Sequence, residues 1–139
     1  MSLAEAEIII DVQFYDLDPM NVVWHGNYVK YTETARCALL DKIGYDYEDM
    51  KKDGVVYPIA KMEMKFIKSA TFGQKLKAKA FLESVEPSLN IKYVIEDAVS
   101  KEVLFKAKTM QIYVDIKSGE SVYEAPEKFK KAVVCLKNI

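Results

Sequence analysis

The sequence contains very few of the residues that build metal and redox sites. Among 139 residues there are one His, one Trp and two Cys. Cys37 and Cys135 lie far apart and lack the spacing of metal ligands. We therefore expect no metal site and no redox cofactor. The two cysteines, both inside predicted helices, are expected to be buried or half-buried free thiols rather than a disulfide.

Long apolar runs and an excess of one charge are also missing. Lys and Arg total 20 against 21 acidic residues, which excludes the electrostatic footprint of a nucleic-acid-binding or membrane-surface protein. Residues 8–10 are too short to span a bilayer, and the acidic segment 1–7 lacks the order of a signal peptide. We expect a cytoplasmic protein that neither binds nucleic acid nor inserts into a membrane.

What is present is the composition of one globular domain over residues 1–139, with 50% hydrophobic and 29% charged residues. Alternation of apolar and polar residues predicts strands over 7–15, 61–66, 75–82, 89–95 and 103–114. A change of parity near Thr109 predicts a β-bulge. The apolar face at Met62, Met64 and Phe66 is expected in the core, and the lysines at 75, 77 and 79 on a solvated face.

A helical period replaces the alternation after residue 27. Apolar residues recur at i+3 and i+4 spacings (Tyr28, Tyr31, Ala35, Leu39 and Ile43). This predicts a long helix with Asn27 as N-cap and Gly44 as its stop. A helical turn at 47–52 and a last helix opening at Pro126 are also predicted. Short loops between the later strands imply an antiparallel meander with the long helix lying across it, an α+β architecture.

The unusual residues gather in segment 14–28 (FYDLDPMNVVWHGNY), which holds the only His and the only Trp. Its two acids, Asp16 and Asp18, precede the predicted helix. A loop that runs into a helix start sets a carboxylate opposite unpaired backbone N–H groups. That pairing suits attack on a carbonyl.

The order of elements resembles the hotdog fold, an antiparallel sheet wrapped around a long central helix with a short C-terminal helix. Segment 14–28 resembles the signature of the 4-hydroxybenzoyl-CoA thioesterase-like branch of hotdog acyl-CoA thioesterases. Segments 58–59 and 69–73 match as well, so the resemblance covers nearly the whole chain. Two departures stand out: Asn21 occupies a position where relatives commonly have Gly, and turn 84–88 lacks the basic residues that several relatives use for nucleotide phosphates.

The resemblance implies roles for six residues. Asp18 is expected to be the catalytic carboxylate, either as nucleophile or as general base. The backbone N–H of His25, with that of Gly26, is expected to polarise the thioester carbonyl. Trp24, Asn27 and Tyr28 are expected to shape the helix entry and to contact substrate.

The expected substrate is an aliphatic or aromatic acyl thioester of coenzyme A or of an acyl carrier protein. No other cofactor is implied. The expected assembly is a homodimer or homotetramer with active sites at a dimer interface.

Other interpretations remain open at this point. Asp18 before Pro19 is also the residue type that caps a loop, and Asp16 is expected to bond nearby backbone. The His25 side chain is a possible base, while Glu33 is expected to form a surface ion pair with Lys30 or Arg36. The alternative functions are a hydratase or dehydratase of the same fold and a non-catalytic module that binds acyl thioesters.

Overall fold

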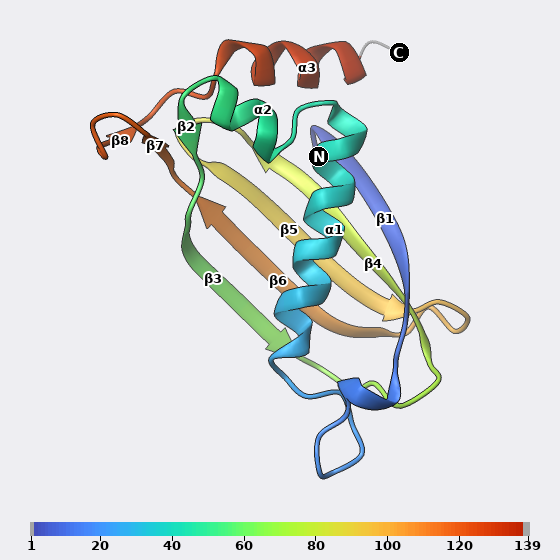
Figure 1. Ribbon diagram of the computed structural model, residues 1–139. Helices are drawn as coiled ribbons and strands as arrows, with labels where there is room; N and C mark the ends of the chain where they lie inside the picture. Colours follow the sequence, from blue (N-terminus) through green and yellow to red (C-terminus); the bar gives the residue numbers. More distant parts are fainter. Residues whose placement is uncertain (1, 138–139) are drawn as a thin grey trace.

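The computed structural model describes residues 2–137 and shows a five-stranded antiparallel sheet curved around one long helix (Figure 1). The strand order is β1-β4-β5-β6-β3, and all neighbouring strands run antiparallel. The bounds are β1 Ala4–Asp11, β3 Ile59–Phe66, β4 Lys75–Ser84, β5 Leu89–Asp97 and β6 Val103–Gln111. Helix α1, Asn27–Ile43, crosses one face of this sheet. The predicted α+β class, meander and central helix are confirmed.

Smaller elements close the end of the molecule that lies away from the start of α1 (Figure 1). They are α2 Tyr47–Lys52, α3 Glu127–Lys137 and a three-stranded sheet of β2 Val55–Val56, β7 Tyr113–Asp115 and β8 Ser121–Val122. The two helices lie where the sequence predicts them. The small sheet was not predicted: β2 and β8 have two residues each, too few to show a period, and most of β7 was included in the predicted strand 103–114.

Helix α1 buries the face that its period predicts. All five apolar positions named above are buried, and the helix packs mainly on β1 and β4. Gly44 ends it in the left-handed region at φ 88°, with its N–H bonded to the Leu40 carbonyl at 2.9 Å. The prediction of Asn27 as N-cap is wrong: Gly26 occupies the cap position and Asn27 is the first helical residue.

The first strand is shorter than predicted. It ends at Asp11, which pairs with Lys75, and the short 3₁₀ helix η1 follows at Phe14–Asp16. The backbone N–H of Gln13 donates to the Asp16 carboxylate at 2.9 Å, which turns the chain out of the sheet. Phe14 is consequently 74% exposed and contacts Phe72 instead of the core.

The bulge predicted near Thr109 is not on β6: the register irregularity of the β3–β6 pair lies on β3, between Ile59 and Lys61, opposite Gln111 and Met110. Phe105, Ala107, Thr109, Gln111 and Tyr113 are all buried, so the alternation stays in phase. The apolar alternation of the sequence suggested a change of parity because two inward-facing residues of this strand are polar. Both are hydrogen-bonded inside the protein. Thr109 bonds the Tyr93 hydroxyl at 3.0 Å, and Gln111 donates to the Tyr57 carbonyl at 3.0 Å.

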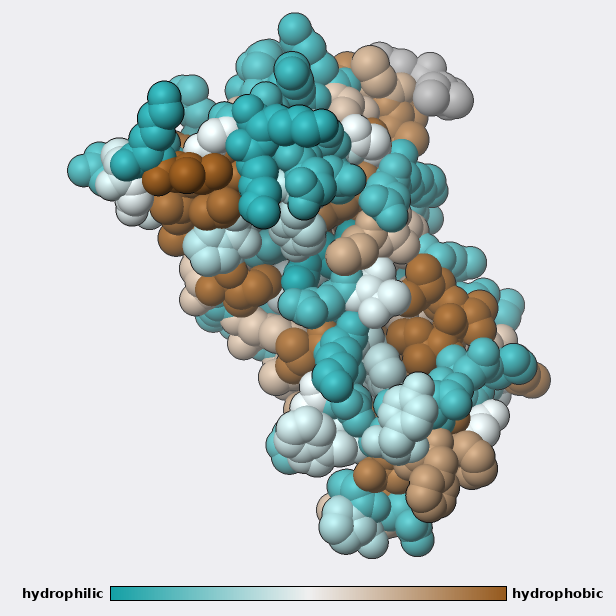
Figure 2. Space-filling model, viewed as in Figure 1, coloured by the Kyte–Doolittle hydropathy of each residue, from teal (hydrophilic) through white to brown (hydrophobic). Residues whose placement is uncertain are grey.

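The apolar face of β3 is more exposed than predicted. Met64 is 41% and Phe66 is 49% exposed, because β3 is an edge strand and α1 lies over β1 and β4 at the other side of the sheet. Hydrophobic atoms accordingly appear on the surface over β3 (Figure 2). This face is core only in part, and the edge beside it carries unpaired backbone groups.

The cysteines depart from expectation as well. Both are free, as predicted, but both are exposed, because Cys37 lies on the solvent side of α1 and Cys135 on that of α3. Within residues 2–137, no three or more His, Cys, Asp and Glu side chains lie together as a metal would require. None of the helices described is long and apolar enough to cross a membrane.

Replacing Leu39 by Ala should test the packing of α1 on the sheet. Leu39 is fully buried, so the loss of contacts and the resulting cavity should lower the free energy of unfolding by about 3 kcal/mol. Val134→Ala, at a position that is 57% exposed on α3, is the control and should change it by less than about 0.5 kcal/mol. Urea unfolding measures both; equal losses would contradict the packing described.

Candidate active site

The loop between β1 and α1 is closed by its own backbone. Leu17 and Val23 form an isolated antiparallel bridge, and the Asp18 N–H donates to the Val22 carbonyl at 2.9 Å. Asn21 sits at the tip with φ 63° and donates its N–H to the Asp18 carbonyl at 2.9 Å. Asn tolerates the left-handed region better than most residues, so it serves at this turn in place of Gly.

The Asp18 carboxylate is held through one of its two oxygens. Oδ1 accepts the Met20 N–H at 2.8 Å, which is the loop-capping bond expected of Asp before Pro. Oδ2 makes no hydrogen bond to any residue in the range 2–137. The side chain is partly buried. It is therefore fixed in direction while one oxygen remains available to a ligand.

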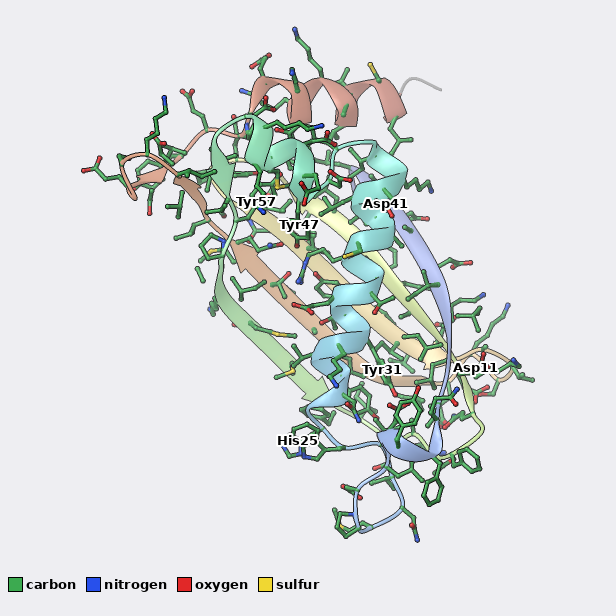
Figure 3. All side chains as sticks on the ribbon, viewed as in Figure 1. Asp11, His25, Tyr31, Asp41, Tyr47 and Tyr57 are labelled. Atoms are coloured by element: carbon green, nitrogen blue, oxygen red, sulfur yellow. The ribbon has the colours of Figure 1, made fainter. Side chains whose placement is uncertain are left out.

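The start of α1 presents unpaired backbone donors near this carboxylate. The Asn27 N–H bonds the Trp24 carbonyl at 2.9 Å and the Tyr28 N–H bonds the His25 carbonyl at 3.3 Å. The amides of His25 and Gly26 donate to no group of the described chain. They lie at the positive end of a helix of 17 residues. Figure 3 shows His25 at this end of α1.

An open pocket of about 260 Å³ joins the loop, the helix start and the end of β3. Of the six predicted site residues it brings together Asp18, His25 and Tyr28, whereas Trp24, Gly26 and Asn27 do not line it. Its other walls are Met20, Val22, Val23, Phe66, Ile67, Lys68 and Ser69.

The contribution of the β3 end was missed from the sequence. The matching segment 69–73 was the available signal, since the Ala70 carbonyl accepts the Val23 N–H at 2.9 Å and ties that segment to the loop.

Tyr28 forms an aromatic wall of the pocket. It is buried, its ring stacks on Phe105 with centroids 4.7 Å apart, and Phe66 lies edge-on at 5.4 Å. Its hydroxyl oxygen accepts the Ala70 N–H at 3.3 Å. Burial raises the pKa of Tyr28 above its ordinary value, so the residue stays a neutral phenol and offers shape rather than acid or base chemistry.

The three predicted residues outside the pocket fix the geometry of the helix start. The Asn27 side chain donates to the Asp16 carbonyl at 2.8 Å, so its amide is already occupied. The Trp24 ring lies directly against Gly26, where a Cβ would overlap it. These contacts of Trp24 and Asn27, both outside the pocket, fix the position of the free amides of His25 and Gly26.

Asp16 bonds its neighbours, as expected, and does not line the pocket. Its carboxylate accepts the Gln13 N–H at 2.9 Å and the Tyr31 hydroxyl at 3.2 Å. Burial, and then the nearby Asp16 charge, raise the pKa of Tyr31 well above its ordinary range. The Tyr31 hydroxyl therefore remains a donor, and Asp16 has a structural role.

The contact between Trp24 and Gly26 can be tested by a double-mutant cycle. Gly26 has helical dihedrals, so only the Trp24 ring opposes a side chain there. Gly26→Ala alone should lower the free energy of unfolding by about 1–3 kcal/mol. In a Trp24→Ala background the loss should be smaller, at most about 1 kcal/mol, because only the preference of a helix cap for Gly over Ala then remains. Urea unfolding of the four proteins gives the coupling energy, and additive effects would show that the ring does not constrain this position.

Comparison with known proteins supports the same family over most of the chain. The family model of the thioesterase-like superfamily matches residues 12–133. A Bacillus subtilis protein provisionally named an acyl-CoA thioesterase (YneP) is 29% identical over 124 residues, covering 88% of this chain and 86% of its own.

Solved structures share the fold at lower identity. A DHNA-CoA thioesterase from Staphylococcus aureus has a TM-score of 0.84 and 23% identity, covering 96% of this chain and 91% of the other. The 4-hydroxybenzoyl CoA thioesterase of Pseudomonas sp. strain CBS-3 has a TM-score of 0.81 and 16% identity, covering 93% and 99%. With the hotdog architecture present and 12–133 matched, the chain belongs to the thioesterase-like superfamily.

Proposed function

We propose that this protein hydrolyses acyl-CoA thioesters to a free acid and a thiol, with Asp18 and the amides at the start of α1 as the catalytic groups. The observation that carries the proposal is the pocket that joins Asp18 to His25 at the helix start. The names of the relatives, two of which act on aromatic acyl-CoAs, support the substrate class.

The free amides supply stabilisation of the oxyanion. Addition to a thioester carbonyl places negative charge on its oxygen, and N–H groups at a helix N-terminus favour that charge. The amides of His25 and Gly26 donate to nothing else within the described residues. Removal of one such donor costs on the order of 10²–10³ in rate in other enzymes.

Asp18 acts either as the nucleophile or as the general base. In one route Oδ2 attacks the carbonyl carbon, the thiolate leaves, and water hydrolyses the resulting mixed anhydride. In the other route Oδ2 removes a proton from a water that attacks directly. Either route needs little help for the leaving group, since an ordinary thiol has a pKa of about 8.5. One carboxylate is enough.

We also infer a homodimer formed along β3. This edge strand exposes Met64 and Phe66, and the exposed Ile67 follows directly after it. Strand pairing with a second copy would cover this surface and the free backbone edge beside it. Phe66 and Ile67 line the candidate pocket as well. A second copy on this edge would therefore border the pocket and could exclude water from it.

Asp18→Asn tests the carboxylate. The Asn side-chain oxygen can still accept the Met20 N–H, so the loop should stay folded while kcat falls at least about 100-fold. Asp11→Asn is the matched control, because Asp11 is an exposed carboxylate paired with Lys75 and lies outside the pocket. The measurement is thiol release from a panel of aliphatic and aromatic acyl-CoAs.

Three results would overturn this assignment. Full activity in Asp18→Asn would remove the carboxylate from the mechanism. Saturable binding of acyl-CoA without thiol release in the wild type would favour the binding module, and hydration of an enoyl thioester would favour the hydratase.

The dimer is tested by Met64→Lys, which places a charge on the exposed face of β3. Light scattering should give twice or four times the chain mass for the wild type. The dissociation constant of the variant dimer should be at least about tenfold higher than that of the wild type. Val134→Lys, at an equally exposed apolar position on α3, should assemble normally. A monomeric wild type would contradict the dimer.

A further inference from the structure

Four lysines lie together on the face of the sheet opposite α1, away from the pocket described above. Lys65 on β3, Lys92 on β5, and Lys106 and Lys108 on β6 are all exposed. They line an open depression of about 380 Å³ with Glu63, and residues 64 and 107 complete its wall. This lysine cluster has no role in the chemistry proposed so far.

The register places these lysines in repelling pairs. Lys92 is directly opposite Lys108, and Lys65 is directly opposite Lys106. Like charges directly opposite on neighbouring strands destabilise a sheet. No ion pair to any of the four occurs within residues 2–137. Glu63, the one acid among them, is directly opposite Lys108 in the register, but its carboxylate pairs with Lys61 at 3.0 Å.

The rest of the same sheet face is arranged differently. On β4, Lys75 pairs with Asp11 at 2.8 Å, Lys79 with Glu96 at 3.1 Å, and Lys77 with Glu7 at 3.8 Å. Ion pairs therefore form on one half of the face, whereas within the described residues the four lysines of the other half form none and have only Glu63 among them. An external anion would relieve the repulsion in the lysine cluster.

Two other candidate phosphate sites, one in the pocket and one at the turn before β5, offer no free cation. Lys68 in the active-site pocket pairs with Glu102 at 2.9 Å. The turn before β5 carries Glu86, which pairs with Lys130 at 2.8 Å and accepts the Ala125 N–H at 3.0 Å. That turn is acidic and tied to the last helix, so it offers no cation to a phosphate.

We propose that the lysine cluster binds the phosphate groups of the coenzyme A part of the substrate. The inference rests on the proposed function. Lys65 and Phe66 are neighbours on β3 whose side chains lie on its two faces, the first in the cluster and the second in the catalytic pocket. The flexible arm between phosphates and thioester would pass around the end of β3, where the strand stops at Phe66.

The dimensions of the cluster favour a nucleotide over an acidic protein. Three strands span about 10 Å and two residues along a strand about 7 Å. A stable protein interface buries about 800 Å² on each partner, far more than this area. Several phosphates on one small molecule match four cations at this spacing.

The test uses one acyl group on two thiols, coenzyme A and N-acetylcysteamine, which has no phosphate. For Lys106→Gln/Lys108→Gln, KM for the acyl-CoA should rise about tenfold while kcat stays unchanged. A tenfold increase is expected because two exposed ion pairs to phosphate are lost. KM for the N-acetylcysteamine thioester should not change. The control Lys75→Gln/Lys77→Gln removes the same charge from the same sheet face and should leave both KM values unchanged.

Free coenzyme A gives a second readout that does not need turnover. It should raise the melting temperature of the wild type and of the control, and raise that of Lys106→Gln/Lys108→Gln less. Added salt should increase KM for acyl-CoA in the wild type more than in the cluster variant.

Three outcomes would overturn the proposal: an unchanged KM for acyl-CoA, an equal change with both thiols, or the same change in the control. A KM increase confined to an acyl carrier protein substrate would also overturn it, in favour of an acidic protein partner. Hydrolysis of the N-acetylcysteamine thioester that still depends on Asp18 would leave the proposed function intact in each case.

Discussion

The candidate site depends on Asp16, a residue that takes no part in the proposed chemistry. Its carbonyl accepts both the Trp24 N–H at 2.9 Å and the Asn27 side chain at 2.8 Å, while its carboxylate holds Gln13 and Tyr31. These bonds fix both the loop that carries Asp18 and the first turn of α1. Because the loop and the helix start are joined at one residue, the carboxylate and the free amides keep a constant relation.

The two faces of the sheet differ in what they contact and in the charge they carry. The face under α1 provides the core at β1, β4 and β5, and leaves β3 partly open beside the pocket. The opposite face is charged, with ion pairs toward β1 and unmatched lysines toward β3. Packing does not explain the exposed apolar residues or the repelling lysines. Both lie on or near β3, the strand that borders the pocket.

The sequence predicted those parts of the fold whose period is carried by apolar residues. Helix α1, its stop at Gly44 and the meander followed from this period, and so did the last helix. The phase of β6 did not, because Thr109 and Gln111 are buried polar residues whose partners are distant in the sequence: Tyr93 on β5 and the carbonyl of Tyr57 between β2 and β3.

Arg36 is another buried polar residue whose contacts the local sequence does not predict. It was expected in a surface pair with Glu33, and it does contact Glu33 at 3.4 Å, yet it is buried. Its Nε donates to the Tyr47 hydroxyl at 2.7 Å, a contact that no local pattern predicts.

The same reasoning applies to the site. The sequence located the loop and the helix start, since unusual residues and a family resemblance coincide there. It could not separate residues that line the pocket from those that support it, because Trp24, Gly26 and Asn27 act through contacts with backbone and with each other. The edge position of β3, which decides the exposure of Phe66, follows from strand order and not from the strand's own sequence.

The most direct test of the account is a crystal structure with an acyl-CoA analogue in which a methylene group replaces the thioester sulfur, so that the carbonyl persists without hydrolysis. We expect the carbonyl oxygen to lie about 3 Å from the N–H of His25 or Gly26, with the carbonyl carbon about 3–3.5 Å from Asp18 Oδ2. A carbonyl bound away from the start of α1, or with Asp18 directed away from it, would contradict the account.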